Sequence, residues 1–131
     1  MPLRRVGLAI IAIGYLPVGL WATFAPMSFY KNFPGLGHHW VAVDGVYNHH
    51  LVTDVGGLNL ALGVIAVIAL ISLTPILVRA TAVGALLYEI PHALYHSQHL
   101  DMFGTTDKVM IMGSFILVIV VALGLLVFDR R

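Results

Sequence analysis

The sequence predicts an all-α integral membrane four-helix bundle, and three observations support that prediction. The chain has 131 residues, of which 60% are hydrophobic and only 10% are charged. Because a soluble domain uses about 25% charged residues, we expect lipid to cover most of this surface. Four apolar stretches are each long enough to cross a bilayer as a helix, which takes about 20 residues. None of the stretches shows the period-2 alternation of barrel strands.

The four stretches form a single transmembrane domain over residues 1–131. The predicted spans are residues 6–25, 51–73, 76–96 and 109–128. Two arginines precede the first span, as they would in a signal peptide. Its apolar run is longer than the roughly 7–15 residues of a signal-peptide core, so we expect a retained helix.

The basic residues predict how the helices are oriented. If the helices alternate, the arginines lie at one membrane face, and these are Arg4, Arg5, Arg79, Arg130 and Arg131. Only Lys31 and Lys108 lie at the other face. Cytoplasmic loops are enriched in Lys and Arg, so both termini are expected in the cytoplasm, with the chain in a prokaryotic plasma membrane. The loop 26–50 is then extracytoplasmic, and we expect it to cap the outer mouth of the bundle.

Titratable side chains gather at the outer end of the third span. All seven histidines and every acidic residue except Asp129 fall in the outer half of this topology. On a helix, Glu89, His92 and His96 share one sector of about 60°. A polar stripe of this kind is costly against lipid, so it is expected to face the bundle interior or a wet cavity.

The second span carries residues that could bind a metal ion together with the histidines of the third span. His50 and Asp54 are four residues apart, and Gly57 continues their side of the helix as a small residue that would let a neighbour approach. Spans two and three are joined by a short turn, so their outer ends are expected to be adjacent. The predicted metal ligands are His50, Asp54, His92 and His96, and the candidate catalytic residues are Asp54 and Glu89. Three imidazoles suit a catalytic zinc site, and the same donors suit copper or iron.

Three functions remain open at this point. The first is a transition-metal protein with redox or hydrolytic chemistry on a lipophilic substrate, in which Asp54 ligates the metal or acts as the base. The second is a non-catalytic accessory subunit of a larger membrane complex or homo-oligomer. The third is an electron-transfer subunit that binds haem or quinone, with His50 and His92 as haem ligands. The simpler alternative to a bound metal or cofactor is that the same residues form a hydrogen-bonded network that holds the ends of the helices together.

The composition of the chain excludes some kinds of site and argues against one kind of partner. The chain has no cysteine, which excludes disulfides and thiolate metal sites. A net charge of +1 with scattered basic residues gives no support for nucleic-acid binding. The sequence leaves open whether the protein is an enzyme, and it assigns no role to His38, His39, His49, His99 and Asp101.

Two stretches of the sequence carry a resemblance. They are Phe-Pro-Gly-Leu-Gly-His-His-Trp within residues 33–62 and Pro-His-Ala-Leu-Tyr-His-Ser-Gln-His-Leu-Asp at 91–101. Together they resemble small, uncharacterised four-helix membrane proteins of actinobacteria, which are distantly similar to the DoxX-like group. The resemblance implies a four-helix bundle in the plasma membrane. It also lends weight to quinone-linked redox chemistry or an accessory role, and it implies no catalytic residue.

Overall fold

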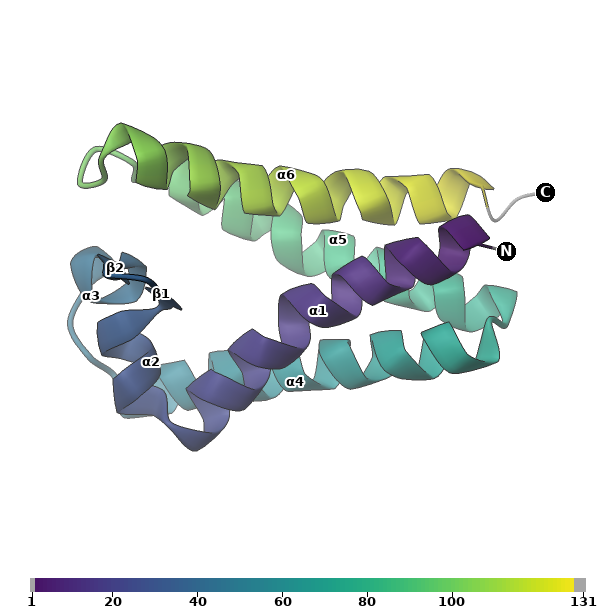
Figure 1. The fold of residues 1–131 in the computed structure, drawn as a ribbon, viewed down its shortest axis with the longest axis horizontal. Coiled ribbons are helices and arrows are strands. Elements are labelled where there is room, and N and C mark those ends of the chain that lie inside the picture. The colour runs from purple at the N-terminus through teal and green to yellow at the C-terminus, as the bar shows by residue number, and fades with distance from the viewer. Residues whose placement is uncertain (1, 129–131) are drawn as a thin grey trace.

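The protein is built almost wholly from helices in the computed structural model, which describes residues 2–128. The helices are α1 (Pro2–Phe24), α2 (Pro26–Asn32), α3 (Trp40–Asp44), α4 (His49–Ser72), α5 (Pro75–Ser97) and α6 (Thr105–Phe128). A two-residue hairpin, β1 (Pro34–Gly35) and β2 (His38–His39), separates α2 from α3. Four of the helices are long and run alongside one another (Figure 1). The all-α prediction is therefore confirmed.

Three of the long helices have the length and composition of membrane spans. These are α1, α4 and α6, and each has an apolar surface with large exposed side chains such as Ile13, Ile71 and Val127. Helix α5 has a similar length but is less apolar, because it includes Arg79, Glu89 and two histidines. The three apolar helices indicate that the protein associates with a membrane.

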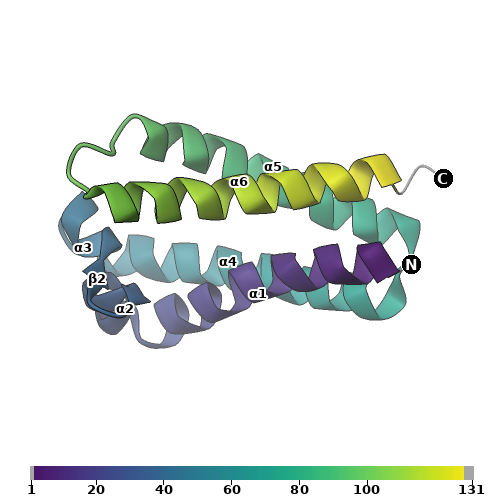
Figure 2. The ribbon, with the colours of Figure 1, turned by 45° about the horizontal axis from the view of Figure 1, so that its top comes forward.

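The long helices form two pairs. Helix α1 packs mainly against α4, and α5 packs mainly against α6 (Figure 2). The start of α1, the turn between α4 and α5, and the end of α6 lie at one end of the molecule. Helices α2 and α3 and the hairpin lie at the opposite end (Figure 1). This places the loop segment over the end of the bundle at which α5 ends, so the predicted cap over the bundle is observed, without reference to a side of the membrane.

Glycines bring α1 and α4 into backbone contact. A Cβ atom on Gly19 would lie 2.4 Å from the Leu60 nitrogen, and one on Gly56 would lie 2.6 Å from the Thr23 nitrogen. Gly63 packs against Leu16, whose side chain would lie 2.7 Å from an added Cβ and whose backbone nitrogen would lie 3.1 Å from it. The expectation that Gly57 provides the close approach is wrong, because a Cβ there would meet nothing within 4 Å. The α4 glycines that allow contact with α1 are Gly56 and Gly63, which lie on a different face of α4 from Gly57.

The segment from Pro26 to Asp44 forms a lid over one end of the bundle. Phe29 of α2 is buried against Ala22 of α1 and Val52 of α4, which attaches the lid to the α1–α4 pair. The hairpin turns through Gly35 and Gly37, whose φ angles of 104° and 84° suit glycine. A second apolar core lies at the other end, between all four long helices. The lid and the long helices together enclose the space described next.

Candidate functional site: an apolar cavity beneath the lid

A cavity of about 380 Å³ lies inside the bundle at the lid end. All four long helices and the lid contribute to its wall, and most of the lining side chains are apolar. Aromatic rings are prominent among them, namely Tyr15, Phe29, Phe33, Trp40, Tyr88 and Phe115. Cavities of this size, apolar with a few polar groups, are the usual form of small-molecule binding sites.

Glu89 is a buried acidic residue in the cavity wall. Its side chain is only 5% exposed, although it belongs to a helix with an apolar outer face. Tyr88, the preceding residue, accepts a hydrogen bond of 3.1 Å from the Asn59 amide of α4. Tyr15 of α1 packs edge-on against Tyr88, with ring centroids 5.9 Å apart. Tyr15 is also near enough to interact with the Glu89 carboxyl group, so helices α1 and α4 both contact this part of α5.

His92 and His96 lie one and two turns closer to the lid than Glu89. Their rings are 4.9 Å apart, and both pack against Phe115 of α6 at 4.6 and 5.3 Å. Asp44, at the end of α3 in the lid, is near enough to interact electrostatically with both imidazoles. The sequence prediction that His92 and His96 face the interior together with Glu89 is thus confirmed, since all three line the cavity.

Several buried polar atoms along this wall have no hydrogen-bond partner. Among the described residues these include the Tyr15 hydroxyl, Asp44 Oδ1, Glu89 Oε2, and the Nδ1 atoms of His92 and His96. Every one of these residues lines the cavity. Buried polar groups are nearly always hydrogen-bonded in native proteins, and leaving one unpaired costs about 1–3 kcal/mol. The five atoms therefore mark places where a ligand or bound water would form hydrogen bonds.

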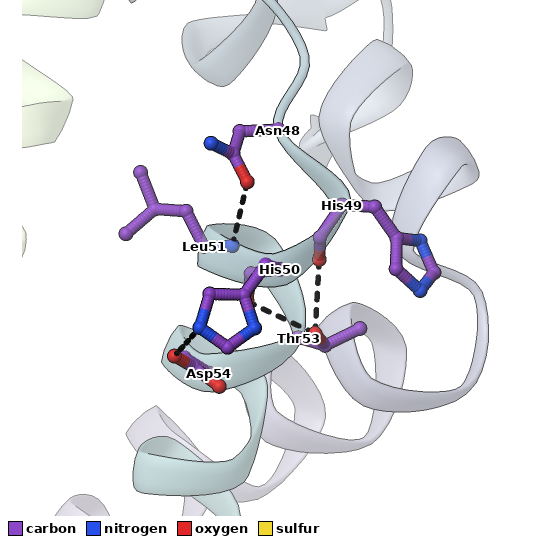
Figure 3. A network of polar contacts seen from close by, with 6 residues as sticks. All are labelled: Asn48, His49, His50, Leu51, Thr53 and Asp54. Carbon is purple, nitrogen blue, oxygen red and sulfur yellow. Dashed lines mark hydrogen bonds and ion pairs between the residues drawn. The ribbon is translucent and has the colours of Figure 1, made fainter.

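His50 and Asp54 lie outside this cavity. They pair with each other at the start of α4, with 3.1 Å between Nε2 and Oδ2, and their side chains are 87% and 63% exposed (Figure 3). The side of α4 that lines the cavity carries Val55 and Asn59 instead. Adjacent residues of a helix point about 100° apart. Helix α4 is therefore turned by about one residue relative to the orientation expected from the sequence.

The predicted four-ligand metal set is consequently not assembled. The structure brings its members together as two separate pairs, His50 with Asp54 and His92 with His96. Within residues 2–128, no three His, Asp or Glu side chains form a group that could hold a metal ion. His50 also does not face His92 across the cavity, so the expected pair of haem ligands is not brought together.

Three histidines outside the cavity make local contacts. His99 stacks on Tyr95 with ring centroids 4.1 Å apart, and its Nδ1 hydrogen-bonds with the Tyr95 carbonyl at 2.7 Å. His39 makes a similar 2.7 Å contact with the Lys31 carbonyl, and His49 hydrogen-bonds with the Tyr47 hydroxyl at 2.8 Å. None of these three histidines lines the cavity, and Asp101 is exposed in the loop before α6.

Asp107 makes a contact with the lid that no pattern in the sequence indicates. Asp107, in the first turn of α6, accepts a 2.9 Å hydrogen bond from the indole of Trp40 and pairs at 2.6 Å with His38. Both partners belong to the lid, and Trp40 also lines the cavity. The residues are separated by almost 70 positions in the chain, and no local pattern links them. This contact attaches the lid to the α5–α6 pair.

The cavity also reaches the side of the bundle. Gly14 of α1 and Ser114 of α6 both line the cavity, and both are exposed. Helices α1 and α6 make closer contact towards the other end, where a Cβ atom on Gly7 would lie 3.0 Å from Leu125. The two helices diverge towards the lid end (Figure 1), and exposed residues beside Gly14 and Ser114, such as Ile13 and Leu117, are apolar.

Comparison with known proteins gives no assignment: no family model, no curated protein and no solved structure matches the chain.

Proposed function

We propose that this is a multi-pass membrane protein that binds a small lipophilic molecule in the cavity beneath its lid. The main support is the combination of about 380 Å³ of apolar space with five unpartnered polar atoms in its wall. The apolar wall suits the body of a ligand, and the polar atoms suit a head group that forms hydrogen bonds. Binding is the activity proposed, and no chemical transformation is assigned to the site.

The proposal includes α5 as a fourth span. Its polar residues Thr81 and Glu89 are buried inside the protein, whereas Leu87 and Leu94 are among its exposed side chains. A helix with this distribution presents an apolar surface to lipid and keeps its polar groups in the bundle interior. With four spans, the arginine distribution favours cytoplasmic termini and a lid on the extracytoplasmic side.

Lipid access supports a lipophilic ligand rather than a water-soluble one. We propose that the cavity opens between Gly14 and Ser114, which line it among exposed apolar residues that include Ile13 and Leu117. A molecule dissolved in the bilayer could enter there without crossing water. A metal ion is less well supported, because two adjacent imidazoles are fewer than the three protein ligands that a catalytic zinc site uses.

Filling the opening tests the proposal. The Ser114→Phe variant would place a ring beside Phe115 and is expected to abolish ligand binding while the protein still folds. The two probes are benzyltrimethylammonium and its uncharged isostere, 2,2-dimethylpropylbenzene. A ligand at a hundredfold excess over its Kd stabilises the folded state by about 2.7 kcal/mol, which is measured as a rise in melting temperature in a non-ionic detergent.

Leu117→Phe is the matched control, because Leu117 is 53% exposed on α6 and does not line the cavity. It should keep the response of the unmodified protein. The proposal is wrong if neither probe raises the melting temperature. It is also wrong if Ser114→Phe responds to the probes as strongly as Leu117→Phe does, since stabilisation would then arise elsewhere.

A further inference from the structure

We infer that the ligand is a lipophilic cation, either an amine or a quaternary ammonium compound, held between Glu89 and Asp44. This inference rests on the proposed function and adds the charge of the ligand to it. Its basis is the chemistry of the cavity wall, in which acidic and aromatic groups are present together.

The charged groups of the wall are all acidic. Glu89 enters from α5 and Asp44 from the lid, and each has a buried carboxylate oxygen without a hydrogen-bond partner. The described residues that line the cavity include no lysine or arginine. An ionised carboxylate is an acceptor only, and it is costly to bury unless a cation or hydrogen-bond donors compensate it. A ligand with positive charge would supply that compensation.

The aromatic residues of the wall suit the same kind of ligand. Rings come from every part of the wall except α4, for example Tyr15 from α1, Trp40 from the lid and Phe115 from α6. The face of an aromatic ring attracts cations, and cages of such rings recognise quaternary ammonium groups. The cavity therefore combines buried carboxylates with aromatic faces around one space.

The other polar groups do not oppose a cation. His92 and His96 are the remaining titratable lining groups on α5 besides Tyr88 and Glu89, and an imidazole is mainly neutral at pH 7.5. A neutral imidazole and the tyrosine hydroxyls can accept hydrogen bonds from an ammonium N–H. From α4 the cavity is faced by the amide of Asn59, which carries no charge.

Two isosteric probes separate the charge of a ligand from its shape. Benzyltrimethylammonium is expected to bind at least tenfold more tightly than 2,2-dimethylpropylbenzene, as measured by melting-temperature titrations in a non-ionic detergent at pH 7.5. Glu89→Gln should weaken binding of the cation roughly tenfold, corresponding to about 1.4 kcal/mol, and leave binding of the uncharged probe unchanged. Asp44→Asn should act in the same direction.

Asp54→Asn is the matched control, since Asp54 is 63% exposed and lies outside the cavity. It should bind both probes as the unmodified protein does. Equal affinity for the two probes, or loss of the cation in Asp54→Asn to the same extent as in Glu89→Gln, would overturn the inference. Equal affinity would leave the proposed function standing, whereas binding of neither probe would overturn both.

Discussion

Replacing Gly19 by alanine is expected to destabilise the protein strongly, by about 3 kcal/mol. The new Cβ atom would lie 2.4 Å from the Leu60 nitrogen and 2.7 Å from its Cα atom. Both are backbone atoms, so no side-chain rotation relieves the overlap, and α1 must move away from α4. The expected fall in melting temperature, followed by circular dichroism in detergent, is on the order of 10 °C.

Gly57→Ala is the control for this substitution. Gly57 also lies inside a helix, but a Cβ atom there would meet nothing within 4 Å. Alanine has a helix propensity about 1 kcal/mol better than that of glycine, so this variant should be as stable as the original protein or slightly more so. If Gly19→Ala and Gly57→Ala melt at the same temperature, the close contact between α1 and α4 is not what holds this pair together.

Replacing Asp107 by alanine is expected to loosen the lid without unfolding the bundle. The substitution removes the acceptor for the Trp40 indole and the partner of His38, which are the two side-chain contacts from the lid to α6 described above. Lys31 lies within α2, so trypsin can cut after it only when this part of the lid opens locally. Cleavage after Lys31 should become several-fold faster, and the melting temperature should change little.

Two further variants identify which contact matters. Asp107→Asn keeps an oxygen that can accept from Trp40 but loses the charge that pairs with His38, so it should fall between the original protein and Asp107→Ala. Asp101→Ala removes an exposed carboxylate from the loop before α6 and should leave cleavage unchanged. Slow cleavage of Asp107→Ala would show that the lid is held by other contacts, such as Phe29 in the apolar cluster.

The helices could be predicted because their signal is long and strong. Runs of about 20 apolar residues have few alternatives to a helix in a membrane protein, and the predicted spans all fall on long helices. The inward direction of Glu89, His92 and His96 was also predictable, since three polar residues share one sector of an otherwise apolar helix. In both cases the decisive information is local in the sequence.

The rotation of α4 could not be predicted from the same kind of information. This helix is apolar on almost every side, so hydrophobic periodicity does not define which face is buried. Gly56 and Gly57 are adjacent and chemically identical, and only the fit against Thr23 of α1 distinguishes them. That fit turns Val55 and Asn59 towards the cavity and His50 and Asp54 away from it. An error of one residue in this choice removes half of the predicted site.

The contact between the lid and α6 was hidden for a different reason. Trp40 and His38 are 67 and 69 positions from Asp107 in the chain and meet it only through the tertiary arrangement of the lid and α6. In the sequence, the aromatic ring suits the membrane interface and the acidic residue suits the first turn of a helix. Each residue already has a sufficient local explanation, so nothing in the sequence indicates that the two are partners.

If the proposed ligand enters between Gly14 and Ser114, that route would determine which concentration of the ligand sets the occupancy of the cavity. A ligand that enters between α1 and α6 is drawn from the bilayer, where a lipophilic compound accumulates far above its level in water. Occupancy then follows the mole fraction of the compound in lipid. Two ligands with the same contacts in the cavity would differ in apparent potency by the ratio of their partition coefficients. Diluting the same amount of compound into more membrane would empty the cavity even when its total concentration is unchanged.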